Sequence, residues 1–102
     1  MPQFAEFVSF RTDDVEEAVF LDRRREAILA VKAAHPALAA VPLLSRAEDG
    51  RWTDVWVYET EEAARAANED AGNIAAFMEM AQLLTELQVT EGVVPERSDS
   101  PL

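Results

Sequence analysis

The sequence predicts an α+β domain in which four antiparallel strands form one sheet and two helices cover one of its faces. Patterns typical of strand, helix, strand, strand, helix and strand follow one another along the 102 residues. Between the second and third strand patterns lies an Asp49-Gly50 pair. Asp-Gly supplies the positive backbone angles of a tight hairpin, so these two strands are predicted to be antiparallel neighbours.

The first strand is predicted over residues 4–11, which are rich in aromatic and β-branched side chains. Asp13 and Glu16 have the spacing of a capping box, so a helix is predicted from about residue 14 to residue 34. It ends before Pro36, because proline disfavours helical geometry in the preceding residue. One broad apolar stripe along this helix also contains Arg24 and is made of Phe20, Leu21, Ala27, Ile28 and Val31.

A short irregular connection over 37–40 leads to the second strand, predicted over 41–47. Pro42 lies at the start of that strand. Proline cannot donate to a ladder of hydrogen bonds, so the strand is expected at an edge of the sheet or to begin only after Pro42.

The third strand is predicted over 51–60, where two kinds of side chain alternate strictly. Successive side chains of a strand point to opposite faces. One face therefore carries Thr53, Val55, Val57 and Glu59, and the other carries Trp52, Asp54, Trp56 and Tyr58. The valine face suits packing beneath helices. The aromatic face, with its carboxylate, suits either a subunit interface or the wall of a small-molecule cavity.

The second helical region is predicted to begin after Thr60, which can cap its N-terminus. It should run over 61–68, break over 69–73 where Gly72 and Asn73 lie, and resume over 74–84. A last strand is predicted over 87–94.

This order of elements, with right-handed crossovers, gives a ferredoxin-like βαββαβ fold with the first and third strands at the centre. The domain should occupy residues 1–94, and residues 95–102 should form a flexible tail. Exposing Trp52, Trp56 and Tyr58 on the uncovered face would create a large apolar patch. We therefore expect a homodimer in which a second copy covers that face.

Composition excludes several classes of function. Twenty acidic against nine basic residues give a formal net charge of −11, which repels nucleic acids and anionic membrane surfaces. The chain has no cysteine, no glycine-rich phosphate loop and no metal-ligand spacing. It has neither a secretory leader nor an apolar run of membrane-spanning length, so a cytoplasmic location is expected.

Three segments resemble the antibiotic biosynthesis monooxygenase-like group: Phe7-Val-Ser-Phe-Arg11, Glu48-Asp-Gly-Arg-Trp-Thr-Asp54 and Thr60-Glu-Glu-Ala-Ala64. The likeness covers about residues 4–94. It implies a dimeric α/β barrel with a cavity between the sheet and the helices of each subunit. Members of this group include cofactor-independent quinone-forming oxygenases, haem-degrading enzymes and proteins without known chemistry. The haem-degrading branch depends on a histidine in the second helical region, and residues 61–84 contain none. No cofactor is therefore expected.

The candidate substrate-binding residues are Glu6, Arg24, Asp54, Trp56 and Tyr58. The aromatic side chains could stack on a flat substrate, although core or interface packing is the simpler role. An acidic residue within an apolar strand needs a partner, so Arg24 is predicted to pair with Glu6 or Asp54. Such a pair could be purely structural or could form the polar end of a ligand pocket.

His35, the sole histidine, is interpreted as a structural cap at the end of the first helix. No residue stands out as a catalytic base. The sequence thus favours a small-molecule-binding dimer. A cofactor-independent oxygenase is the sharper hypothesis: a phenolic substrate would lie against Trp56, Arg24 would stabilise its anion, and dioxygen would react directly. The alternative is a non-catalytic dimerisation module, and a ligand-sized cavity distinguishes the two.

Overall fold

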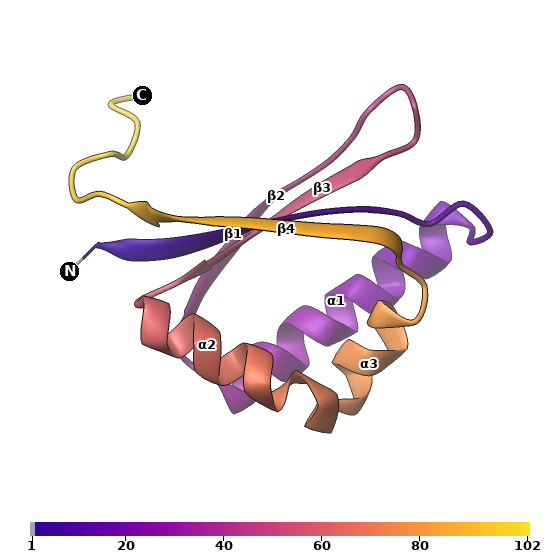
Figure 1. Ribbon diagram of the computed structural model, residues 1–102, viewed down its shortest axis with the longest axis horizontal. Coiled ribbons are helices and arrows are strands. Elements are labelled where there is room, and N and C mark those ends of the chain that lie inside the picture. The colour runs from indigo at the N-terminus through magenta and orange to yellow at the C-terminus, as the bar shows by residue number, and fades with distance from the viewer. Residues whose placement is uncertain (1) are drawn as a thin grey trace.

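The computed structural model describes residues 2–102, that is, all but Met1. Its strands and helices follow in the predicted order (Figure 1). The elements are β1 (Gln3–Arg11), α1 (Glu17–Ala34), β2 (Leu38–Arg46), β3 (Trp52–Tyr58), α2 (Glu61–Asp70), the 3-10 turn η1 (Ala71–Asn73), α3 (Ala75–Ala81) and β4 (Thr85–Val94). Beyond Val94 the chain leads away from the sheet (Figure 1).

The strands of the described chain form one antiparallel sheet in the order β2-β3-β1-β4. The first and third strands lie at the centre, which confirms the predicted topology. β2 lies at one edge, and its pairing with β3 shifts register between Ala40 and Leu43. Val41 and Pro42 lie between these two residues, and Pro42 lacks the N–H that a regular ladder needs. The expectation of an edge strand is therefore confirmed.

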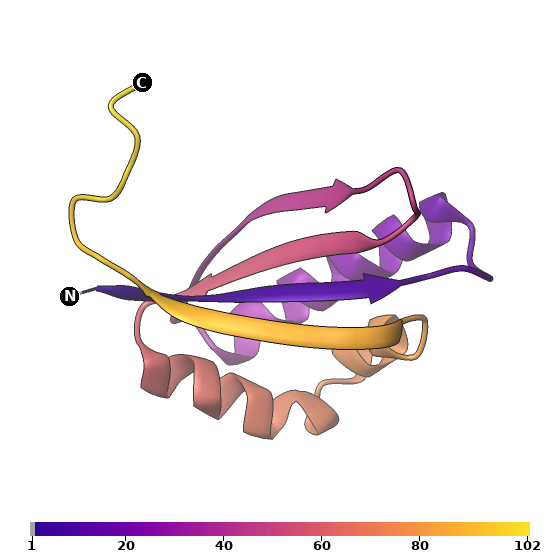
Figure 2. The ribbon, with the colours of Figure 1, turned by 45° about the horizontal axis from the view of Figure 1, so that its top comes forward.

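The helices all cover the same face of the sheet and leave the opposite face bare (Figures 1 and 2). α1 packs alongside α3. The buried residues of α1 are Phe20, Ala27 and Val31, three of the five predicted to form its apolar stripe. Leu21, another of the five, is 41% exposed and lies outside the buried stripe.

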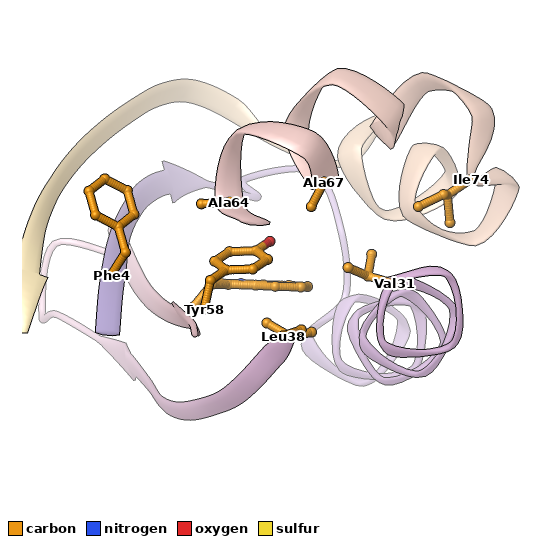
Figure 3. Close-up of a cluster of buried hydrophobic side chains, with 8 residues drawn as sticks. Phe4, Val31, Leu38, Tyr58, Ala64, Ala67 and Ile74 are labelled. Carbon is orange, nitrogen blue, oxygen red and sulfur yellow. The ribbon is translucent and has the colours of Figure 1, made fainter. Parts of the chain in front are cut away.

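The core between helices and sheet has two parts. The first surrounds the start of α2 and is shown in Figure 3; it consists of Phe4, Val31, Leu38, Trp56, Tyr58, Ala64, Ala67 and Ile74. The second lies under α1 and α3 and consists of Phe10, Phe20, Ala27, Trp52 and Met80. In the second part the Phe20 ring centroid lies 5.5 Å from that of Phe10 and 5.1 Å from that of Trp52.

The valine face of β3 was predicted to pack beneath the helices, and this prediction is wrong. Of the two roles predicted for the aromatic face, the structure shows the cavity wall, which Asp54, Trp56 and Tyr58 line. Trp52, Trp56 and Tyr58 are between 3% and 5% exposed and pack beneath the helices, whereas Val57 lies on the bare face. Strict alternation defines two faces but does not say which one the helices cover. The large rings fill the space under α1, α2 and α3, so they do not form the exposed patch on which the homodimer was argued.

Several element boundaries also differ from prediction. α1 begins at Glu17 after Glu16, which makes no side-chain capping bond, so the predicted Asp13 capping box is wrong. β2 begins at Leu38, earlier than the predicted residue 41; Leu38 pairs with Tyr58 of β3 and is 2% exposed in the core. The predicted cap at Thr60 is confirmed, since its hydroxyl accepts a hydrogen bond from the Ala63 N–H at 3.1 Å.

The break in the second helical region is narrower than predicted. α2 continues through Asp70, and only η1 interrupts it before α3 begins at Ala75. α3 ends at Ala81, shorter than the predicted segment, and β4 begins earlier than expected, at Thr85. The stronger helix–sheet contacts are those of α1 with β2 and of α2 with β1 and β3, and β4 lies at the edge of the sheet.

Candidate functional site

A cavity of about 420 Å³ lies between the helix-facing side of the sheet and the helices α2 and α3. This volume falls within the range of small-molecule sites. Most of its wall is apolar. The lining residues are Glu6, Val8, Phe10, Asp54, Trp56, Tyr58, Asn68, Phe77, Met80, Ala81, Leu84, Leu87, Val89 and Glu91. The cavity is open beside β4, where Leu87 and Val89 are 56% and 50% exposed.

Strand register places the polar residues of the sheet on this wall. In the central strand pair, Glu6 lies opposite Trp56 and Val8 lies opposite Asp54. On the other side of β1, Glu6 lies opposite Glu91 of β4. Side chains opposite one another point to the same face of an antiparallel sheet. The two-residue period of three strands therefore brings these side chains to one surface.

Glu6 is a buried carboxyl group in the cavity wall, and Asp54 is another. Glu6 is 6% exposed, and its Oε2 accepts a hydrogen bond from Asn68 Nδ2 at 2.6 Å. Burial raises the pKa of Glu6, the Asn68 hydrogen bond opposes that shift, and the charge of Glu91 adds to it. A carboxylate held at a raised pKa can accept a proton from a weak acid more readily than an ordinary glutamate.

Tyr58 places a hydroxyl on the same wall. The residue is 3% exposed, and Figure 3 shows its oxygen directed toward α2. Burial and the charge of Glu6 raise the pKa of the Tyr58 phenol far above its usual value, so the hydroxyl stays protonated. Within the described part of the chain this hydroxyl has no hydrogen-bond partner. It is available to a molecule in the cavity.

Asp54 is 2% exposed and is held by Arg24 of α1. Arg24 donates from Nε to Oδ2 and from Nη2 to Oδ1, both at 2.9 Å, which is a bidentate pair. Of the two partners predicted for Arg24, the structure thus shows Asp54 and not Glu6. Arg24 does not line the cavity. Its charge is compensated behind the wall, where it fixes α1 to the sheet.

Aromatic rings form the flat part of the wall. The ring centroids of Trp56 and Phe77 lie 6.4 Å apart at an interplanar angle of 82°, an edge-to-face contact. Met80 adds a side chain that adapts to irregular shapes. A planar apolar molecule can pack against these surfaces.

Four of the five candidate residues from the sequence therefore line the cavity: Glu6, Asp54, Trp56 and Tyr58. The sequence interpretation missed Asn68 as a residue of the site: it lies within α2 and bonds Glu6. A signal was present, because Asn68 lies four residues after the buried Ala64 and so shares its helix face. Glu91 could have been found from the register of the last strand.

His35 has the structural role that the sequence indicated. It ends α1, and its backbone N–H donates to the Val31 carbonyl at 2.7 Å. Its Nε2 lies 2.8 Å from Asp70 Oδ2. Hydrogen bonds from Asn73 and His35 hold the pKa of Asp70 below its ordinary value. None of these residues lines the cavity.

Residues 2–102 contain no group of three or more His, Asp or Glu side chains arranged to hold a metal ion. No helix among them is both long and apolar enough to cross a membrane.

By sequence, no protein-family model and no curated protein matches this chain. Solved structures do resemble it. SnoaB, a cofactor-independent oxygenase from Streptomyces nogalater, is 20% identical with a TM-score of 0.66, and the match covers 98% of each chain. A proposed antibiotic biosynthesis monooxygenase from Caulobacter crescentus is 15% identical with a TM-score of 0.70, over 93% of this chain and 92% of that one.

A third similar structure is described as a dimeric ferredoxin-like protein from an uncultured marine organism. It is 15% identical with a TM-score of 0.63, over 95% of this chain and 91% of that one. At these identities the likeness concerns the fold. The predicted fold class is confirmed, and so is the resemblance in fold to solved structures of the antibiotic biosynthesis monooxygenase-like group: the chain has a ferredoxin-like fold shared with those proteins.

Proposed function

We propose that this protein binds a small, flat aromatic molecule in the cavity between the sheet and the helices α2 and α3. The observation that carries the proposal is a ligand-sized cavity whose wall is apolar except for a few buried polar groups. If side chains filled this space, the non-catalytic dimerisation module would be the better hypothesis. The cavity is bordered by the strand carboxylates Glu6 and Asp54, while Arg24 lies behind it.

The polar groups define how the molecule would lie. Its rings would pack against Trp56 and Phe77, and a hydroxyl would reach Glu6 and Tyr58 at the inner end. Glu6 accepts one hydrogen bond from Asn68, and its second oxygen remains for the ligand. A phenol suits this position because it donates to a carboxylate and stacks on an indole.

The chemistry that we propose is oxidation of such a phenol by dioxygen without a cofactor. Glu6 would accept the phenol proton, and the electron-rich ring would react directly with dioxygen at the carbon para to the oxygen. One oxygen atom becomes the new carbonyl. The other leaves as water with the phenol proton and the hydrogen of that ring carbon. SnoaB, which shares the fold, is described as a cofactor-independent oxygenase.

The test uses 1-naphthol, which one dioxygen converts to 1,4-naphthoquinone and one water. Calorimetry measures binding, and an oxygen electrode with quinone absorbance measures turnover. We expect Trp56→Ala to weaken binding at least about tenfold, because the stacking surface is lost. Glu6→Gln should keep binding within about threefold and lower the oxidation rate at least about a hundredfold, in the range of general-base catalysis.

Glu79→Gln is the matched control for the charge change, because Glu79 is exposed on α3 and does not line the cavity. Binding without oxygen uptake would retain the binding proposal and reject the oxidation. If neither 1-naphthol nor naphthalene binds, the protein is better explained as a non-catalytic dimerisation module.

We also propose a homodimer that forms through the bare face of the sheet. Its centre is apolar, with Phe7 and Leu43 at 43% and 55% exposure beside Val55 and Val57. A contiguous apolar patch on a strand surface is typical of an interface. One solved structure with this fold is described as dimeric. Sedimentation of Phe7→Lys tests the proposal: the wild type should sediment as a dimer of the 11.3 kDa chain, and the variant as a monomer.

A further inference from the structure

The polar lining of the cavity includes acidic side chains but no basic one from residues 2–102. It comprises Glu6, Asp54, Tyr58, Asn68 and Glu91, and among the described residues that line the cavity there is no Lys, Arg or His. The charge of Asp54 is compensated by Arg24. Glu6 and Glu91 have no salt bridge in the described part of the chain.

Glu6 and Glu91 lie directly opposite each other on neighbouring strands, on the helix-facing side of the sheet. In such a pair the Cβ atoms are roughly 4.5–5.5 Å apart, and like charges destabilise the sheet. Arg65 of α2 feels the charge of Glu91, but its guanidinium bonds Glu61 and is 66% exposed. The repulsion between the buried Glu6 and the exposed Glu91 is therefore not offset by a salt bridge within the described chain.

Tyr58 gives independent evidence that the wall of the cavity can bond a ligand. The residue is 3% exposed and lines the cavity, and no group of the described chain bonds its hydroxyl. The lone pairs of this hydroxyl can accept a hydrogen bond from an ammonium group. Asn68 is exposed, and its amide nitrogen bonds Glu6.

We propose that the ligand of this cavity carries a protonated amine beside its aromatic rings, and that the amine binds between Glu91 and Glu6 at the β4 side. The inference rests on the proposed binding of an aromatic molecule and names the class of that molecule. The rings occupy the apolar part of the cavity, and the ammonium group reaches the carboxylates near the open side. A cation there removes the repulsion between the two strands.

An organic cation fits this place better than a metal ion. Calcium takes six to eight oxygen ligands, whereas two carboxylates face each other here amid apolar side chains such as Leu87 and Val89. An ammonium group needs few acceptors. It also gains from an aromatic face close by, which Trp56 provides on the same wall.

The experiment compares three ligands with the same ring system and different charge: 1-naphthylmethylamine, 1-naphthylmethanol and 1-naphthoate. Binding to the full chain is measured by calorimetry at pH 7.5 and low ionic strength. We expect the amine to bind at least about tenfold more tightly than the alcohol, because charge-assisted hydrogen bonds are the stronger ones. The carboxylate should bind more weakly than the alcohol.

Glu91→Gln should reduce the preference for the amine over the alcohol to within about threefold while alcohol binding stays unchanged. Glu79→Gln removes the same charge from the surface and should leave the preference intact. Equal affinities of amine and alcohol for the wild type would overturn the amine inference and leave the proposed aromatic site standing. Failure of all three ligands to bind would overturn both.

Discussion

Both faces of the sheet carry apolar side chains, but the helices of the described chain cover only one face (Figure 1). On the helix-covered face, Phe10 and Trp56 are 2% and 5% exposed, and polar groups among them are paired or line a cavity. On the bare face, Phe7 is 43% exposed, and Val55 is covered by its neighbours alone. The covered face thus combines folding with ligand binding, whereas the bare face is free to serve assembly.

A single strand can therefore supply residues both to the cavity and to the bare face. β1 gives Glu6 to the cavity and Phe7 to the bare face, one residue apart. Because adjacent strand residues point in opposite directions, substitutions on one face should leave the function of the other intact. The variants below change residues of one face, and the measurements test whether the function of the other face is affected.

The largest effect is expected from Asp54→Ala. The substitution leaves the partly buried Arg24 without its carboxylate, and breaking such a pair costs up to about 3–5 kcal/mol where the charge is fully buried. Urea unfolding followed by circular dichroism measures the loss. Glu17→Gln is the control, because it removes the exposed partner of Arg46 and should cost about 1 kcal/mol or less. Equal losses of unfolding free energy for the two variants would show that the Arg24–Asp54 pair stabilises the fold no more than the exposed Arg46–Glu17 pair.

The next effect compares two phenylalanines of β1. Phe10→Ala removes a ring from the core and should lower the free energy of unfolding by about 3–5 kcal/mol. Phe7→Ala should lower it by about 1 kcal/mol or less and instead weaken self-association at least about tenfold. Urea unfolding and sedimentation, each at a fixed protein concentration, measure the two quantities. If Phe10→Ala weakened self-association and Phe7→Ala did not, the dimer interface would not lie on the bare face of the sheet.

A smaller effect is expected from Thr60→Ala, which removes the cap of α2. The Thr60 hydroxyl accepts from the Ala63 N–H, and loss of such a cap costs about 1 kcal/mol. Since α2 covers the cavity, the variant should also bind 1-naphthol more weakly, while sedimentation stays as in the wild type. Thr60→Ser keeps the hydroxyl and should restore both stability and binding.

The smallest effect concerns the pH dependence of stability at Glu6. Its pKa is raised in the folded protein, so below the ordinary pKa of 4.5 it is protonated in both states and costs nothing. As the pH rises above 4.5, the unfolded chain ionises first, and the folded state loses stability until Glu6 ionises as well. Glu6→Gln should remove this loss, so the variant gains stability relative to the wild type with rising pH.

Unfolding of wild type and Glu6→Gln between pH 4 and pH 8 measures that difference. The groups that face Glu6 are Glu91 of β4, Tyr58 of β3 and Asn68 of α2. Parallel stability curves for the two proteins would mean that Glu6 ionises alike in the folded and unfolded chain.

Local patterns in the sequence predicted the order of the elements, the central pair of strands, the edge position around Pro42 and the cap at Thr60. These features depend on local patterns: a two-residue or helical period, a turn pair and residues with special backbone chemistry. The sequence also indicated that Arg24 needs a strand carboxylate, because a charge within an apolar stripe must be paired.

Three features could be seen only in the folded structure: the face of β3 that the helices cover, the carboxylate that Arg24 binds, and the hydrogen bond from Asn68 to Glu6, which are 62 residues apart. Alternation along a strand is symmetric between its two faces, so the pattern could not reveal that the tryptophans point inward. A cavity is the space left after side chains from distant segments have packed. Its shape and charge depend on that packing, which no local pattern records.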